Sequence, residues 1–203
     1  MPLTKKNYDP ASPIQLINDI VTTERSGIGK WGPQSKEGLL DFCFWLRSVM
    51  PKGFSMAEIG CYAGESTVAF AMIAGQVHAI DPWVNGYDDD DLSSSIFSME
   101  LVKASYAYRI QGFHNICTIQ ATGEHATSEF ANGSLDVVYI DAIHKLGANR
   151  DEINRWLPKI KEGGYIAGHD FCGYWGEVVD SVLETVGLPD FRTKDGSWAK
   201  QIN

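Results

Sequence analysis

Apolar and polar positions along this 203-residue chain follow a pattern typical of strands alternating with helices. Short apolar runs predict seven strands, at residues 54–59, 77–80, 116–120, 135–140, 165–167, 191–193 and 197–201. Apolar residues spaced by three and four predict helices over residues 35–50, 66–74, 96–110, 150–157 and 178–186. Ser66 is expected to cap the second of these helices.

The order of these elements predicts the fold class. Strands that alternate with helices of this size form parallel sheets joined by crossover connections. We therefore expect an α/β protein with a Rossmann-like, seven-stranded, mostly parallel sheet, helices on both faces and an antiparallel hairpin at the C-terminus. Residues 35–203 would form this single domain. Residues 1–34, which prolines and glycines interrupt, would form an N-terminal cap or loop segment.

A glycine-containing turn follows the first strand, in the sequence Glu-Ile-Gly-Cys-Tyr-Ala-Gly-Glu-Ser-Thr at residues 58–67. Gly60 and Gly64 permit a tight turn, and the helix start and the Ser66 hydroxyl offer hydrogen-bond donors to a carboxylate. Tyr62 interrupts the G-x-G-x-x-G spacing that a dinucleotide pyrophosphate requires. Asp81 ends the second strand, 21 residues after Gly60, where an acid suits a ribose diol.

This turn together with Asp81 resembles the motif of class I S-adenosylmethionine (SAM)-dependent methyltransferases. More narrowly, it is similar to that of the catechol O-methyltransferase-like group and its relatives that methylate macrolide sugars. The resemblance spans about residues 35 to 201, and it implies SAM as the cofactor. It implies these cofactor-binding residues: Glu58, Gly60, Tyr62, Gly64, Ser66, Asp81, Trp83 over one face of the adenine, Thr122 in the stretch 121–124 that would cradle the adenine, and Asp141.

Two carboxylates and two imidazoles follow the next strands, with Asp141 and His144 after the fourth and His169 and Asp170 after the fifth. Parallel strands present their carboxyl ends at one edge, so these four side chains should meet there. Methyl transfer needs an aligned acceptor and a group that removes its proton, and His144 and His169 are the candidate catalytic bases.

The resemblance also implies a divalent-metal site made by Asp141, His169 and Asp170. Carboxylates favour Mg²⁺, and a histidine shifts the preference towards Mn²⁺, Fe²⁺ or Zn²⁺. The family has a carboxylate where this chain has His169, so both the presence and the identity of the metal are open.

Charge and composition restrict the partners. The chain has 17 basic and 26 acidic residues and a formal net charge of −9, which argues against a nucleic-acid partner. Its apolar runs are too short for a membrane span, and no apolar signal core follows the N-terminus, so a cytoplasmic location is expected. The four cysteines form no CxxC pair, which argues against a zinc site. The acidic run 88–91 is interpreted as a solvated loop before a helix.

The function predicted from the sequence is SAM-dependent O-methylation of a small hydroxylated metabolite such as a sugar. Three alternatives remain open at this point. They are an NAD-binding oxidoreductase on a similar sheet, a non-catalytic SAM-binding protein, and a metal-dependent oxygenase built on the histidine and aspartate cluster. A homodimer is a further expectation for a chain of this size.

Overall fold

The computed structural model describes residues 33–88, 91 and 93–203 of the chain, so residues 1–32 of the predicted N-terminal segment lie outside the described residues. At its centre is a seven-stranded sheet in the order β3-β2-β1-β4-β5-β7-β6. The strands are β1 (Ser55–Ile59), β2 (Gln76–Ile80), β3 (Ile116–Ile119), β4 (Leu135–Ile140), β5 (Ile160–Gly168), β6 (Phe191–Arg192) and β7 (Trp198–Gln201). The first five of these strands run parallel, whereas β7 pairs antiparallel with β5 and with β6. The predicted fold class is confirmed.

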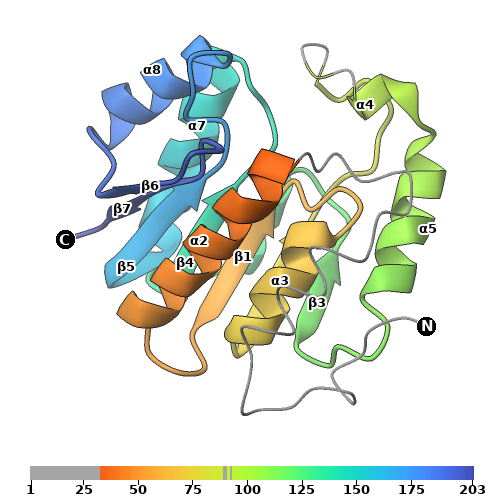
Figure 1. The fold of residues 1–203 in the computed structure, drawn as a ribbon, viewed down its shortest axis with the longest axis horizontal. Helices are drawn as coiled ribbons and strands as arrows, with labels where there is room; N and C mark the ends of the chain where they lie inside the picture. The colour runs from red at the N-terminus through yellow and green to blue at the C-terminus, as the bar shows by residue number, and fades with distance from the viewer. Residues whose placement is uncertain (1–32, 89–90, 92) are drawn as a thin grey trace.

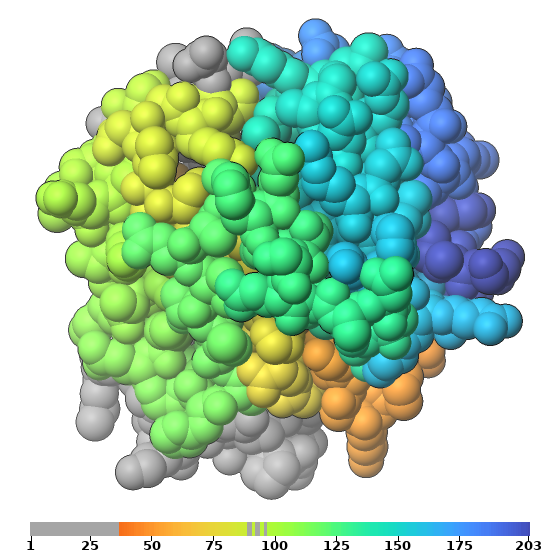
Figure 2. Space-filling view, turned by 180° about the vertical axis from the view of Figure 1, so that it is seen from behind, coloured from red at the N-terminus to blue at the C-terminus, as the bar shows by residue number. Residues whose placement is uncertain are grey.

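Helices cover both faces of this sheet. On one face lie α2 (Pro33–Val49), α3 (Glu65–Ile73) and α5 (Met99–Arg109), and Figure 1 shows α2 and α3 in front of the strands. On the other face lie α6 (Gly123–Ala126), α7 (Leu146–Trp156) and α8 (Gly176–Thr185). The view from behind shows the middle of the chain, in green to cyan, covering this second face (Figure 2). None of the described helices is long and apolar enough to cross a membrane.

Residues of each central strand contribute alternately to the two cores. Met56 packs with α2 and α3, whereas the adjacent Ala57 packs with α7 and α8. Val137 and Val138 on β4 divide in the same way. Side chains on a strand point alternately to opposite faces, so a strand buried on both sides is apolar throughout. This explains why the apolar runs of the sequence predict the central strands well.

Four predicted elements differ most from the structure, and one of them is α7, which begins at Leu146 and not at the predicted residue 150. Strand β5 begins at Ile160, whereas the prediction began at residue 165. Residues 161–164 are charged residues and glycines, so no apolar run marks this part of the strand in the sequence. The helix expected over residues 96–110 is divided into α4 (Ser93–Ile96) and α5. The prediction that Ser66 caps a helix is wrong, because α3 starts at Glu65 and its N-cap residue is Gly64 in the left-handed conformation.

Candidate functional site

One pocket lies at the carboxyl edge of the parallel strands and encloses about 1080 Å³ of empty space, its open mouth included. Concave pockets with a few converging polar groups are the usual sites of small-molecule binding. The ends of β1, β2, β4 and β5 line it, together with residues 82–88 after β2. The predicted residues that meet in its wall are Gly60, Tyr62, Ser66, Asp81, Asp141, His169 and Asp170.

Backbone geometry shapes the turn after β1. Gly60 has a φ of 88°, and a Cβ atom at this position would lie 1.8 Å from the backbone oxygen of Asp141. Gly64 has a φ of 83°. Only glycine adopts such angles without a steric penalty. The turn therefore passes directly against the end of β4, and the glycines are needed because the chain approaches itself there.

Asp81 binds this turn through its carboxylate. Its Oδ2 accepts a hydrogen bond of 2.8 Å from the backbone N–H of Tyr62, and its Oδ1 accepts one of 2.7 Å from the N–H of Trp83. The side chain is buried yet lines the pocket. Each oxygen of a carboxylate accepts more than one hydrogen bond, so the same group can also receive a pair of ribose hydroxyls. The turn and the acid share one cleft, as a SAM site requires.

Glu58 lies beneath the turn, fully buried, and accepts hydrogen bonds from the hydroxyls of Ser66 and Thr67. Burial raises the pKa of Glu58 from 4.5 to about 7, although the two hydroxyl hydrogen bonds lower it. The Ser66 hydroxyl is therefore directed at Glu58, although Ser66 is also one of the residues that line the pocket. Glu58 organises the start of α3 from below, and it is not part of the pocket wall.

Two of the predicted adenine contacts lie outside the pocket wall. The Trp83 indole donates a hydrogen bond of 2.9 Å to the Tyr62 carbonyl and packs against Tyr106 within the core. Thr122 is the N-cap of α6 and accepts from the His125 backbone N–H. Its neighbour Gly123 lines the pocket instead, at a point where a Cβ atom would lie 1.9 Å from a carboxylate oxygen of Glu152.

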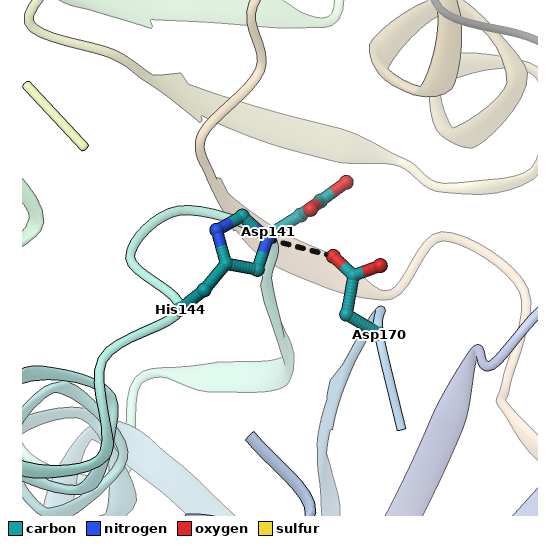
Figure 3. A group of neighbouring side chains, drawn as sticks. All are labelled: Asp141, His144 and Asp170. Atoms are coloured by element: carbon teal, nitrogen blue, oxygen red, sulfur yellow. Dashed lines mark hydrogen bonds and ion pairs between the residues drawn. The ribbon is translucent and has the colours of Figure 1, made fainter. Parts of the chain in front are cut away.

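On the other side of the pocket, the ends of β4 and β5 bring together Asp141, His144 and Asp170 (Figure 3). His144 Nε2 lies 2.9 Å from Asp170 Oδ2. Asp170 has a φ of 63°, an uncommon backbone angle for a non-glycine residue, and such angles cluster at functional sites. The His144 ring also stacks on Trp175, with the ring centroids 4.0 Å apart.

The second nitrogen of His144 contacts Asp88, which is part of the acidic run after β2. His144 Nδ1 lies 2.5 Å from Asp88 Oδ2, and the backbone N–H of His144 donates to the same oxygen at 3.1 Å. Only 5% of Asp88 is exposed, so the interpretation of residues 88–91 as a solvated loop is wrong for Asp88. Asp89 and Asp90 lie outside the described residues. The sequence contains no local signal that distinguishes Asp88 from the acids next to it.

His169 occupies a neighbouring position in the pocket wall. Its Nδ1 lies 3.1 Å from Asp170 Oδ1, and its Nε2 lies 3.5 Å from the Asp195 carboxylate. Burial lowers the pKa of both imidazoles, but hydrogen bonds to their carboxylate partners outweigh this effect. The pKa of His144 rises to about 9 and that of His169 to about 11, while the two imidazoles hold the pKa of Asp170 below its usual range. A cation bound at His144 would have to displace the proton on Nε2, because a protonated ring nitrogen has no lone pair to donate.

The donor set differs from the predicted metal ligands in one residue. One ligand atom from each of Asp141, His144 and Asp170 lies within 4.8 Å of the others, whereas His169 is not part of this group. Two carboxylates and one imidazole fit a divalent cation, and the imidazole favours Mn²⁺, Fe²⁺ or Zn²⁺ over Mg²⁺. The side chains present therefore fit a metal, with His144 in place of His169.

Comparisons with known proteins agree with this geometry. A family profile described as a methyltransferase domain matches residues 57–171, which is more than half of the chain. This match begins in β1 and ends just after Asp170, so it contains both the glycine turn and the acceptor-side cluster. A search of curated protein sequences finds no match.

Three solved structures illustrate the likeness of fold. A proposed O-methyltransferase from Klebsiella pneumoniae is 16% identical with a TM-score of 0.62, and the match covers 97% of this chain and 91% of that one. An rRNA methylase from Streptococcus thermophilus is 14% identical with a TM-score of 0.58, over 82% and 97% of the two chains. A proposed methyltransferase from Streptococcus mutans, in complex with S-adenosylhomocysteine (SAH), is 13% identical with a TM-score of 0.55, over 78% and 92%.

The family match covers both halves of the pocket, and the turn held by Asp81 provides the geometry that the cofactor requires. The chain therefore belongs to the methyltransferase domain family and is a SAM-dependent methyltransferase.

Proposed function

We propose that the protein transfers the methyl group of SAM to a hydroxyl oxygen of a small molecule, assisted by a divalent cation. One observation carries this proposal. The same pocket is lined by the turn that Asp81 holds and by the carboxylates of Asp141 and Asp170. A methyl donor bound at the turn would therefore lie next to an acceptor bound at the two carboxylates, and this proximity is the main requirement of an in-line displacement.

The cofactor would bind along the first two strands. Asp81 would accept hydrogen bonds from the ribose hydroxyls, and the turn at Gly60 to Gly64 would hold the methionine end near the first N–H groups of α3. Gly123 lines the pocket, so the backbone of residues 121–124 would lie beside the adenine. The S. mutans structure was solved in complex with SAH, which supports SAM as the cofactor.

Asp141, His144 and Asp170 would hold the cation. A cation bound there lowers the pKa of a coordinated hydroxyl and fixes its direction. The contacts of these residues limit their freedom in advance. Asp170 is held by both His144 and His169, and His144 is held by Asp88. The cluster is thus pre-organised, which reduces the entropy lost when the acceptor binds.

We propose His169 as the residue that receives the acceptor proton. It lines the pocket, whereas His144 lies between two carboxylates and does not. In the free protein the pKa of His169 is raised to about 11, so the ring is protonated. A positive charge placed in the pocket, such as the SAM sulfonium, lowers the pKa of an imidazole. The imidazolium would release its own proton to solvent as the pocket fills, and the neutral ring would then receive the proton of the acceptor hydroxyl.

Small molecules are the proposed class of acceptor, although one relative is an rRNA methylase. The net charge of −9 opposes binding to a phosphate backbone. The acceptor side of the pocket is itself acidic, with Asp88, Asp141 and Asp170 close together. Such a site favours a neutral, hydroxyl-rich acceptor over a polyanion.

The test is a single-turnover experiment with SAM labelled in its methyl group. Purified protein is mixed with sugars, catechols, other hydroxylated metabolites and structured RNA, each with Mn²⁺ and with a chelator. The proposal predicts transfer to a hydroxylated small molecule that the chelator suppresses. Transfer to RNA alone would refute the acceptor class, and transfer unchanged by the chelator would refute the role of the cation. SAM binding without transfer to any of these hydroxylated small molecules would also refute the acceptor class.

A further inference from the structure

We propose that Asp88 is a positioning residue, which attaches the segment after β2 to the end of β4 and orients His144 so that Nε2 faces Asp170. The part of this inference that concerns the cation rests on the function proposed above. Nothing in the motif or in the expected metal ligands points to Asp88. Its assignment comes from three-dimensional contacts alone.

The segment in question is residues 82–88, and four of its members line the pocket: Pro82, Val84, Tyr87 and Asp88. Its backbone is held by Ser94 on α4, since Gly86 N–H donates to the Ser94 carbonyl at 2.9 Å and the Ser94 hydroxyl donates to the Asp88 carbonyl at 2.7 Å. The Asp88 carboxylate then spans to β4 by contacting both the backbone N–H and the ring of His144. This carboxylate thus connects the cofactor side of the pocket to the acceptor side.

The same contact defines the direction of the His144 ring. A short hydrogen bond from Nδ1 to Asp88 leaves Nε2 for Asp170 and the proposed cation. Histidines that bind metals commonly donate their other N–H group to a carboxylate, which fixes the ring and the ligating nitrogen. The stacked Trp175 restricts the ring from its face, so Asp88 and Trp175 together leave one orientation. Asp88 acts through His144 and does not touch the reacting atoms.

Two variants and one control test this assignment. Asp88→Ala removes the acceptor, Asp88→Asn keeps an acceptor oxygen without its charge, and Asp180→Asn removes a negative charge from an exposed position on α8. The first measurement is NMR of the metal-free, ¹⁵N-histidine-labelled protein. A proton in a short, buried hydrogen bond resonates far downfield and exchanges slowly with water, so the His144 Nδ1–H signal reports the contact without any cation or substrate.

The signal should be present in the wild type and in Asp180→Asn, shifted upfield in Asp88→Asn, and lost to exchange in Asp88→Ala. Hydrogen exchange at residues 82–88 should also accelerate in Asp88→Ala. Mn²⁺ affinity should fall about 10- to 100-fold in both Asp88 variants, as for other partners of metal-binding histidines. If both variants keep the wild-type signal and exchange rates, Asp88 does not position this ring. If wild-type protein binds no Mn²⁺, the proposed cation is wrong, while the NMR and exchange results still decide the role of Asp88.

Discussion

The two halves of the pocket are built in different ways. On the cofactor side, the backbone provides most of the geometry, through the glycines of the turn and the N–H groups that bind Asp81. Those residues lie close in sequence, with Tyr62 and Asp81 separated by 19 positions. On the acceptor side, side chains provide the geometry, and His144 meets partners that are 26 and 56 positions away.

This difference indicates which changes each half tolerates. Backbone turns depend on the glycines and on the sheet beneath them, so a substitution that distorts the turn should damage the whole edge. Side-chain clusters can lose one member while the backbone remains, so changes there should affect chemistry more than folding. Each substitution below tests one side of this comparison.

The largest effect is expected for Gly60→Ala. Backbone strain at such a φ costs about 1–3 kcal/mol, and the new Cβ atom would also meet the Asp141 carbonyl at 1.8 Å. The variant should unfold at much lower denaturant concentration and lose both SAM and Mn²⁺ binding. Gly133→Ala is the matched control, because Gly133 also has a positive φ but its Cβ would meet nothing within 4 Å. Equal stability of the two variants would contradict the close approach of Gly60 to the Asp141 carbonyl.

A change limited to chemistry is expected for His169→Gln. Loss of a general base commonly lowers the rate by about 10²- to 10⁴-fold. The rate constant for methyl transfer should fall by this amount in single-turnover experiments, while SAM affinity measured by calorimetry stays at the wild-type value. A rate equal to that of Asp180→Asn would assign His169 a structural role only.

The buried acid beneath the turn should make stability depend on pH. The folded-state pKa of Glu58 is raised to about 7 from the ordinary value of 4.5, so the folded protein holds this proton over a range in which the unfolded chain has lost it. The resulting stabilisation is complete below pH 4.5 and is lost as the pH rises through about 7. Each unit by which the folded-state pKa exceeds the ordinary value contributes about 1.4 kcal/mol to the free energy of unfolding.

Glu58→Gln removes this titration. The free energy of unfolding of the variant, measured by urea denaturation, should increase relative to wild type as the pH rises from about 4.5 to about 7. A constant difference between the two proteins across that range would show that Glu58 has an ordinary pKa in the folded state.

The smallest effect is expected for Asp81→Asn. The variant loses a charge-assisted acceptor, a change that costs about 1.5–3 kcal/mol and corresponds to an approximately 10- to 100-fold weaker affinity for SAM. Mn²⁺ affinity should remain unchanged, because Asp81 is not a member of the Asp141, His144 and Asp170 group. A parallel loss of Mn²⁺ binding would show that the two halves are not separable.

Most of the cofactor side of the pocket could be predicted from the sequence, whereas less of the acceptor side could. The glycine turn and Asp81 follow from spacing along two consecutive strands, and the structure joins them by a hydrogen bond. Asp141 and Asp170 could be placed because both follow apolar strands. The position of the imidazoles could not be predicted, since a residue at the end of a strand does not reveal which partner its ring will face.

The order of strands and helices, the parallel sheet with its terminal hairpin, and the turn that faces Asp81 were determined by the sequence alone. They depend on periodicity and on short separations along the chain, which any reader of the sequence can measure. Only the tertiary structure decided that His144 rather than His169 joins Asp141 and Asp170, that Trp83 packs into the core, and that Asp88 contacts His144. These outcomes depend on side-chain rotamers and on packing between distant segments, where several arrangements share one sequence pattern and only the assembled fold selects among them.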